Sequence, residues 1–315
     1  MTHLSLCSGI GGLDLAIGTP TTFAEIDPAP AEVLAEWFPE VPNLGDWTQL
    51  DTFNDWPHLI TGGLPCQPVS AAGKGRGDTD ERYLFDDFTR ILRSSDVRPT
   101  LVLENVRGIL YPRNGVAFWR LISALADLGY MGRWEVVRAS DVGAPHRRER
   151  WFCVARHADS MAGETSFEVG GGFLERQFGQ RQGTGAGSRM LASHPDGKGL
   201  QRRRIEERSS AGEWAAGKSR VALLSSRYGP AVERWEALTR PCPAPLDDGH
   251  RLSVAFVEWM MGYPDGWTAP LSRAKALKAL GNAVVPQQAR LAVQILNEPL
   301  PASPQTLLDN ESETA

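Results

Sequence analysis

A doubly wound α/β sheet with a smaller, irregular second domain is the fold that the sequence predicts. Apolar, strand-like runs alternate with amphipathic helical stretches over the first 157 residues. The composition then turns glycine-rich, with ten glycines between residues 161 and 200, and helical periodicity returns after residue 250. Strands that alternate with helices are typical of a mainly parallel sheet covered on both faces. At 315 residues, 42% of them hydrophobic, the chain is long enough for one large domain or two unequal ones.

The first half of the chain supplies the strands of this sheet in order. Each short apolar run predicts a strand, and each longer stretch with helical spacing of its apolar residues predicts a helix. Strands are expected at Leu4–Cys7, Thr22–Ile26, Leu59–Gly63, Thr100–Glu104 and Trp151–Ala155, and helices at Leu13–Ile17, Ala29–Trp37 and Leu84–Arg93.

The second half predicts loops followed by helices. The glycine-rich stretch has no clean period, which favours loops or a small irregular domain. Helices are expected at Val254–Met261, Ala274–Leu280 and Pro286–Leu296. We therefore expect one domain from residues 1–157 and 251–298, a second from residues 158–250, and a flexible tail from 299 to 315.

Charge is distributed unevenly along the chain, whose formal net charge is −5. Residues 1–159 carry 15 Lys and Arg against 21 Asp and Glu, whereas residues 181–240 carry 12 against 6. A basic segment in an acidic protein is the pattern expected where one module contacts phosphates. A solvated, arginine-rich loop would give the same counts.

The cysteines and the hydropathy pattern indicate an intracellular protein. Cys7, Cys66, Cys153 and Cys242 are too widely spaced for a metal-binding knuckle and match no secreted disulfide framework, so no metal is expected. No apolar run approaches the roughly 18 residues of a membrane span. The first residues also lack the basic leader and apolar stretch of a signal peptide. We expect a cytoplasmic protein of a bacterial or phage-infected cell, in which a free thiol is available for chemistry.

Two features near the N-terminus suggest a nucleotide-like ligand. The first strand runs into closely spaced glycines before a helix, which lets backbone N–H groups approach a ligand, although a turn alone also needs glycine. Glu25 ends the second expected strand, where a carboxylate can accept bonds from both ribose hydroxyls. Asp46 is a candidate for an adenine amino group, with Trp47 beside the ring. A helix N-cap or a solvated acid is the alternative explanation for either carboxylate.

Cys66 is a candidate nucleophile. A lone cysteine after a strand is more often a small buried hydrophobe. Here, however, it lies between Pro65 and Pro68, at the head of a charged, glycine-rich stretch over residues 71–80. A thiol on a rigid turn, followed by a segment able to close over it, is typical of covalent catalysis.

Two further groups of polar residues stand at strand ends. Glu104 and Asn105 follow three apolar residues, at the sheet edge where ligands bind in open α/β folds. A partly desolvated carboxyl there can have a raised pKa and donate a proton. Arg147, Arg148 and Arg150 precede the last expected strand. Such an arginine cluster on its own is usually a salt-bridged surface.

Taken together and in this order, the motifs resemble those of DNA (cytosine-5)-methyltransferases of bacterial or phage type. The matching motifs are the glycine-rich start, Pro-Cys-Gln at 65–67, Glu-Asn-Val at 104–106, Arg-x-Arg at 148–150 and Gly-Asn-Ala-Val-Val-Pro at 281–286. The resemblance covers residues 3–157 and roughly 250–296. It implies a Rossmann-like sheet that binds S-adenosylmethionine (AdoMet), a target-recognition domain at 158–250, and methyl transfer to carbon 5 of a cytosine flipped out of duplex DNA.

The resemblance also implies a role for individual residues. Cys66 would attack carbon 6, Glu104 would hold nitrogen 3 and the exocyclic amine, and Arg150, supported by Arg148, would hold the carbonyl oxygen on carbon 2. The positions that match AdoMet contacts are Leu6, Cys7, Gly9, Ile10, Gly11, Glu25, Ile26, Asp46, Trp47, Pro65, Leu84, Asn282 and Val284. Contacts to the DNA substrate are expected from Gln67, Ser70, Lys74, Asn105, Arg202, Arg203 and Arg204. Asn105 is also expected to order the turn around Glu104.

The chain departs from the family pattern at three positions. Cys7 stands where an aromatic residue often packs against the adenine, and Ser5 where an acid is common; both are expected to weaken AdoMet binding. His146 replaces a frequent glutamine.

Two alternative functions follow from the same residues: a tRNA cytosine-5 methyltransferase and a catalytically inactive DNA-binding homologue. The long segment at 158–250 favours DNA, and the complete set of Cys66, Glu104 and Arg150 argues against lost activity. We expect a monomer that acts on double-stranded DNA, with any cognate restriction endonuclease a separate protein.

Overall fold

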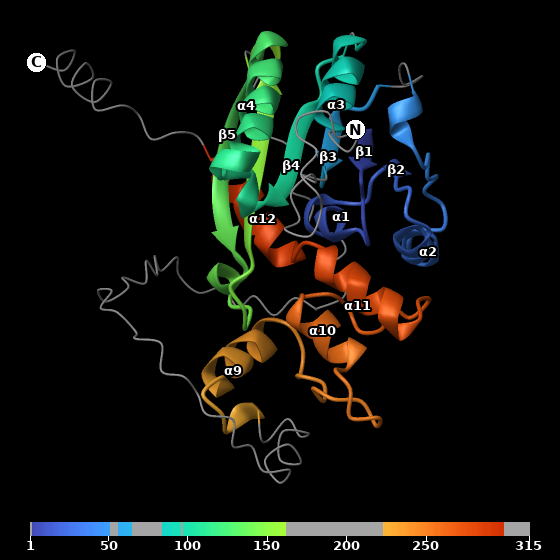
Figure 1. The fold of residues 1–315 in the computed structure, drawn as a ribbon, viewed down its shortest axis with the longest axis vertical. Coiled ribbons are helices and arrows are strands. Elements are labelled where there is room, and N and C mark those ends of the chain that lie inside the picture. Colours follow the sequence, from blue (N-terminus) through green and yellow to red (C-terminus); the bar gives the residue numbers. More distant parts are fainter. Residues whose placement is uncertain (1, 51–55, 65–83, 96, 162–222, 299–315) are drawn as a thin grey trace, which may run out of the picture.

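The computed structural model describes residues 2–50, 56–64, 84–95, 97–161 and 223–298 and contains one six-stranded sheet (Figure 1). The strand order is β2-β1-β3-β4-β6-β5. The strands β1 to β4 run parallel, whereas β6 is antiparallel to both of its neighbours. Their bounds are β1 His3–Leu6, β2 Thr22–Ala24, β3 Leu59–Gly62, β4 Thr100–Val106, β5 Tyr130–Arg138 and β6 Glu149–His157. The predicted α/β class is confirmed.

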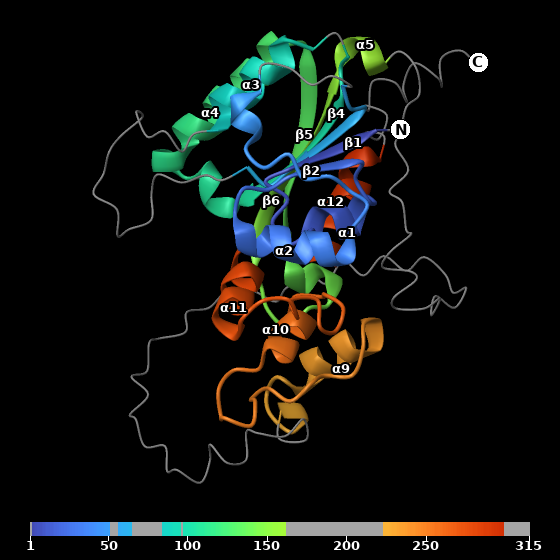
Figure 2. The ribbon, with the colours of Figure 1, turned by 90° about the vertical axis from the view of Figure 1, so that its right-hand side faces the viewer.

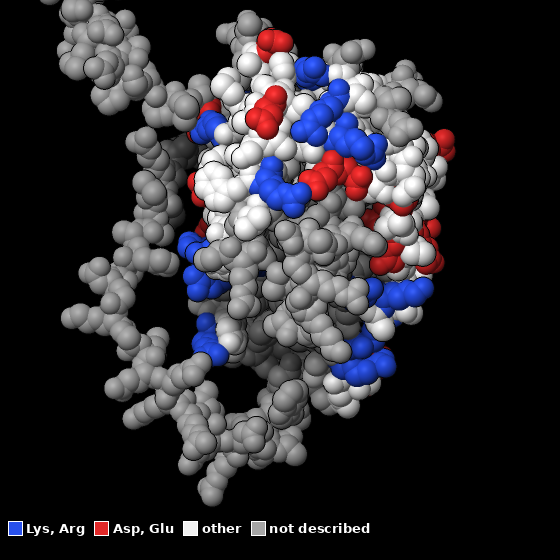
Figure 3. Space-filling view, turned by 45° about the horizontal axis from the view of Figure 1, so that its top comes forward, with Lys and Arg blue, Asp and Glu red and all other residues white. Residues whose placement is uncertain are grey.

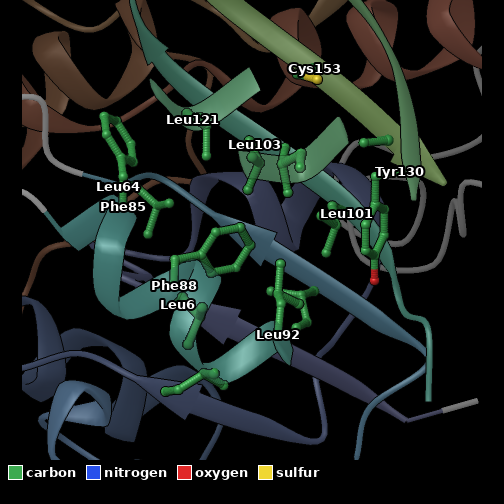
Figure 4. Close-up of a cluster of buried hydrophobic side chains, with 14 of the residues drawn as sticks. Leu6, Leu64, Phe85, Phe88, Leu92, Leu101, Leu103, Leu121, Tyr130 and Cys153 are labelled. Atoms are coloured by element: carbon green, nitrogen blue, oxygen red, sulfur yellow. The ribbon is translucent and has the colours of Figure 1, made fainter. Parts of the chain in front are cut away.

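Helices cover both faces of this sheet (Figure 2). On one face lie α3 (Leu84–Arg93) and α4 (Pro112–Asp127), and on the other α1 (Gly12–Ile17) and α12 (Pro286–Asn297). Successive side chains of a strand point to opposite faces, so Leu101 and Leu103 pack toward α3 and α4 while Val102 packs toward α12. All three are nearly inaccessible to solvent, and Figure 4 shows Leu101 and Leu103 within the cluster of side chains on the α3–α4 side. Burial of both faces explains why the central strands read as continuous apolar runs.

Local sequence explains where the helices begin. The carboxylate of Asp27 accepts a hydrogen bond from the Ala29 N–H and caps α2 (Pro28–Trp37), whose first residue is a proline. The helix α12 likewise starts at a proline, Pro286, which needs no hydrogen-bond acceptor for its nitrogen.

A second group of helices lies beyond the lower end of the sheet in Figure 1: α9 (Gly229–Leu238), α10 (Val254–Met260) and α11 (Arg273–Asn282). The indole N–H of Trp235 donates to the Trp259 carbonyl, 2.8 Å away, and joins α9 to α10. The indole of Trp267 reaches the Ile10 carbonyl at the same distance and joins these helices to the start of α1. Residues 223–250 therefore pack on the residues that follow them, and the boundary at 250 stays a prediction.

Short helices complete the connections: η1 (Trp47–Gln49), η2 (Arg107–Leu110), η3 (Ala139–Val142) and α5 (Ala158–Met161). The predicted elements in the described residues are all present, with ends that differ by at most a few residues. The elements α4, β5 and α9 were not predicted. Among the helices of the described residues, none is long and apolar enough to cross a membrane. The same part of the chain holds no group of three or more His, Cys, Asp or Glu side chains suited to a metal ion.

Candidate active site

The four parallel strands end at one edge of the sheet, and the predicted site residues follow those ends. In the sheet, β2 lies on one side of β1, whereas β3 and β4 lie on the other side of β1. Ligands in open α/β sheets bind outside the carboxyl ends of the strands, where the strand order reverses in this way. We describe this edge as a β1–β2 side, with Cys7, Gly9, Glu25 and Asp46, and a β4–β6 side, with Gly63, Glu104, Arg148 and Arg150.

On the β1–β2 side, a carboxylate anchors the glycine turn. Glu25 accepts hydrogen bonds from the N–H groups of Gly9 (2.7 Å) and Asp27 (2.8 Å). Burial raises the pKa of Glu25, and these backbone donors oppose the rise. Gly9 has a φ of 55°, which favours glycine, and a side chain built there would meet no atom within 4 Å. Open space therefore lies beside the turn and the carboxylate.

Asp46 and Cys7 border the same side. The Asp46 carboxylate caps η1 by accepting bonds from the Thr48 N–H (3.0 Å) and hydroxyl (2.6 Å), so the structure shows the N-cap that the sequence left open. Cys7 has a φ of 49°. Burial raises the pKa of its thiol to about 12, and a hydrogen bond with the buried Trp47 side chain only partly opposes this rise. Cys7 is therefore a neutral thiol at ordinary pH.

The remaining predicted AdoMet contacts differ in exposure. Leu6 and Ile10 are core side chains with 2% and 1% exposure, so only their backbone atoms can meet a ligand. Gly11 closes the turn by donating its N–H to the Ser8 carbonyl. The others are an exposed Ile26, an exposed Asn282, a buried Val284, and Leu84, whose side chain is outside the described atoms.

On the β4–β6 side, a carboxylate faces an arginine across two antiparallel strands. Arg150 Nε lies 3.0 Å from Glu104 Oε1, and the two side chains are only 13% and 15% exposed. Glu104 pairs directly with Phe152, so Arg150 is its diagonal neighbour on the same face of the sheet. Burial raises the pKa of Glu104, while Arg150 and then Arg148 oppose that rise. This pair combines a carboxyl suited to holding a proton with a fixed cation.

The residues that follow β3 lie beside the pair formed by Glu104 and Arg150. A side chain at Gly63 would lie 3.5 Å from Glu104 Oε2, so the carboxylate lies beside this glycine. The amide of Asn105 donates to the Leu64 carbonyl (2.7 Å), and its Oδ1 accepts the Val106 N–H. Asn105 thus ties the end of β4 to the residue that enters the Pro-Cys-Gln motif, in addition to ordering the turn after Glu104.

Arg148 connects this pair to the loop before α12. It has a φ of 29°, unusual for a residue with a side chain. Its guanidinium donates to the carbonyl oxygens of Gly281 (2.8 Å) and Ala283, on either side of Asn282. Burial lowers its pKa to about 10, still well above neutrality. Arg148 therefore acts on Glu104 through its charge and on the loop through hydrogen bonds.

Several predicted residues lie outside the described residues: Pro65, Cys66, Gln67, Ser70, Lys74, Arg202, Arg203 and Arg204. Figure 3 shows one face of the molecule. Over the upper part of this face, the blue Lys and Arg side chains lie among the red Asp and Glu side chains.

The sequence analysis missed two groups of residues that shape the site. Glu149, which lies between Arg148 and Arg150, binds Arg107 (2.6 Å) and Arg138 (3.0 Å), and these arginines lower its pKa. Gln288, on α12, donates to the carbonyl of Arg148. The single acidic residue among the three arginines at 147–150 could have indicated the first group. No local signal could have indicated the second, because Gln288 lies 140 positions from its partner.

Comparison with known proteins identifies this arrangement. The family model described as C-5 cytosine-specific DNA methylase matches residues 1–177, more than half of the chain. The chain belongs to this family. A DNA methylase assignment also favours DNA over tRNA as the substrate.

Individual relatives agree with the family assignment. The Type II methyltransferase M.BsuFI of Bacillus subtilis is 29% identical over 297 residues, which span 90% of this chain and 69% of that protein. For M.NgoMIV of Neisseria gonorrhoeae the identity is 27% over 307 residues, with 90% and 93% covered. The solved structure of the S. pombe Dnmt2 methyltransferase superposes with a TM-score of 0.56 at 17% identity, with 94% of this chain and 98% of that one covered, and shows the same fold.

Within the C-5 cytosine methylase family, methyl transfer implies the use of AdoMet, and the β1–β2 side fits that group. The open space beside Gly9 admits a ligand next to the backbone, and the Glu25 and Asp46 carboxylates both lie near Cys7 on this side. A carboxylate at the end of the second strand is the usual partner of ribose hydroxyls in such sheets.

Proposed function

We propose that this chain methylates carbon 5 of a cytosine flipped out of duplex DNA, within a specific sequence, through a covalent bond between Cys66 and carbon 6. The observation that carries the proposal is the contact between Glu104 and Arg150 beside Gly63, because the next residues of the chain lead directly to Cys66. This arrangement supports convergence of a thiol, a carboxyl and a guanidinium on one pyrimidine.

The chemistry assigns each group a task. AdoMet, held by Glu25, Asp46 and the Gly9 turn, supplies an electrophilic methyl group when bound. Cytosine carbon 5 is a poor nucleophile until a thiolate adds to carbon 6 and a proton reaches nitrogen 3. We assign the thiolate to Cys66 and the proton to Glu104, because burial raises the pKa of this carboxyl and so favours its protonated form. After transfer, which leaves S-adenosylhomocysteine, a base takes the carbon 5 proton, the sulfur departs as a thiolate and nitrogen 3 returns its proton to Glu104. These steps restore the aromatic ring and the starting form of both side chains.

Arg150 has two tasks in this scheme. Its guanidinium binds the carbonyl oxygen on carbon 2, where negative charge develops as the thiolate adds, and it orients Glu104. Asn105 fixes the Leu64 carbonyl and so positions Cys66. The base must leave the helix to reach these groups, at a cost of a few kcal/mol that pocket contacts recover.

Recognition of the DNA sequence is assigned to residues 158–250. Arginines such as Arg202, Arg203 and Arg204 are proposed to contact phosphates and set the register, while other side chains read base edges. The Type II names of the relatives suggest a restriction-modification setting, in which a separate endonuclease would cut the same sequence when it is unmethylated.

Two experiments test this function. Bisulfite sequencing of DNA from cells that express the protein should reveal 5-methylcytosine in one sequence context. A duplex with 5-fluorocytosine at that position, incubated with AdoMet, should then give an adduct that resists denaturation. Cys66→Ser should form none, whereas Cys153→Ala, which removes a thiol buried in the core, should form it normally. Methylation of tRNA but not of duplex DNA, or an adduct with Cys66→Ser, would overturn the proposal.

A further inference from the structure

The turn that carries Arg148 is held in a conformation that its own residues do not favour. Arg148 lies in the positive-φ region, where a side chain crowds the backbone. Such conformations persist only when surrounding contacts enforce them. Two residues farther on, Arg150 meets Glu104, so the geometry of this turn determines how Arg150 enters the sheet.

Gln288 on α12 supplies one of these enforcing contacts. Its side-chain amide donates to the carbonyls of Val137 (2.8 Å) and Arg148 (2.7 Å). Both N–H groups of one amide are thus used to join the end of β5 to the Arg148 turn. The Ala139 N–H donates mainly to the neighbouring Arg147 carbonyl (2.8 Å) and lies 3.4 Å from the Arg148 carbonyl, so the short hydrogen bond to the Arg148 carbonyl among the described contacts is the one from Gln288.

Packing does not explain a glutamine at this position. Gln288 is 0% exposed, and its neighbours along the buried face of α12, Ala289, Ala292 and Val293, are all small and apolar. Its Oε1 has no hydrogen-bond partner among the described residues. A buried amide with an unpaired oxygen is less favourable than an aliphatic side chain of the same length. The two bonds it donates are therefore the property that distinguishes it from methionine or leucine here.

The same turn links the β4–β6 side to the loop before α12. Through its guanidinium, Arg148 holds the Gly281 and Ala283 carbonyls around Asn282, and through its charge it acts on Glu104. A clamp on the Arg148 backbone consequently fixes groups on the β4–β6 side and in the loop before α12 together.

We propose that Gln288 is a positioning residue for the methyltransferase reaction: it clamps the strained Arg148 turn so that Arg148 and Arg150 are set against Glu104. This inference rests on the proposed function of those three residues. Gln288 itself contacts neither the base nor AdoMet.

The test compares Gln288→Met with Gln287→Met. Methionine keeps the length of the side chain and removes the amide. Gln287, the adjacent residue, donates to the Gly262 carbonyl (3.0 Å), away from the Arg148 turn, and so controls for the general cost of losing an amide at the start of α12. The measurements are the melting temperature, kcat and KM for duplex DNA, and the pH dependence of kcat.

Loss of the clamp should lower kcat by tenfold or more, because small misplacements of positioned groups are costly. The alkaline limb of the kcat profile should move to higher pH, since Arg150 and Arg148 no longer hold down the pKa of Glu104. Gln287→Met should leave both properties unchanged. If Gln288→Met does not fold, Gln288→Asn, which keeps an amide too short to reach both carbonyls, should show the same kinetic changes.

Two negative outcomes have different consequences. If the wild-type protein methylates DNA and Gln288→Met matches Gln287→Met in kcat and pH profile, the residue is only structural and this inference is wrong. If the wild-type protein does not methylate duplex DNA, the proposed function fails instead.

Discussion

The two sides of the sheet edge differ in how far apart in sequence their partners are. On the β1–β2 side, the Glu25 carboxylate binds Gly9 and Asp27, and the Asp46 carboxylate binds Thr48, so these carboxylate contacts join residues at most 16 positions apart. On the β4–β6 side, Glu104 meets Arg150, and Arg148 meets Gly281. These partners are 46 and 133 positions apart.

This difference has a physical consequence. The carboxylates of the β1–β2 side are bound within local turns, so a substitution of one of them should change binding of one ligand and little else. The β4–β6 side depends on strands and helices from separate parts of the chain, and its charged groups act on one another at low exposure. A substitution there should change several properties together.

The largest expected effect is that of Arg150→Ala on the β4–β6 side. It removes a fixed cation from a buried carboxyl, so kcat should fall by about 10²–10³-fold, the usual loss for one charge-stabilising donor. The pKa of Glu104 should rise further, since burial then acts with less opposition. Steady-state kinetics with duplex DNA measure the effect on the β4–β6 side. Calorimetry of AdoMet binding measures whether the β1–β2 side is affected.

Arg120→Ala is the control for this variant. Its side chain, 47% exposed, pairs with Asp86 of α3 at the surface. It should leave kcat nearly unchanged. An Arg150→Ala protein with normal kcat would show that the contact with Glu104 has no part in the reaction.

A smaller effect, confined to one ligand, is expected for Glu25→Ala on the β1–β2 side. Hydrogen bonds to a charged group are worth about 1.5–3 kcal/mol, so the Kd for AdoMet should rise about 10–100-fold. At saturating AdoMet, kcat should recover to within about threefold. A fall in kcat that saturating AdoMet does not restore would contradict the separation between the two sides.

The same contrast explains how much the sequence could predict. The strands, the glycine turn and Glu25 were predicted from short stretches, because each depends on neighbouring residues. The pairing of Glu104 with Arg150 depends on the antiparallel β6, whose register no local pattern specifies, so it came from the resemblance to a family. The helix α4 and the strand β5 were not predicted, although Phe118, Leu121 and Leu125 recur at helical spacing.

A third variant, Asn105→Ala, tests the connection between β3 and β4. It removes the bond to the Leu64 carbonyl, a buried contact worth about 1 kcal/mol, so the adduct with 5-fluorocytosine should form about five- to tenfold more slowly. AdoMet affinity should not change. If the rate of adduct formation were normal, Asn105 would not position Cys66, and the bond would be only part of the folded structure.

The smallest expected effect is a pH dependence of AdoMet binding on the β1–β2 side. Burial raises the pKa of Glu25 above its ordinary value of 4.5, so the carboxylate takes up a proton at a higher pH than an exposed glutamate. Only the ionised form offers all its oxygens as acceptors to ribose hydroxyls. The Kd should therefore rise a few-fold as the pH falls from 7.5 toward 5, and Glu25→Gln should abolish this dependence. Titrations at several pH values measure it, and the melting temperature at each pH separates it from unfolding. A dependence that persisted in Glu25→Gln would assign the titrating group to another residue, and the Glu25 carboxylate would no longer be the proposed ribose ligand.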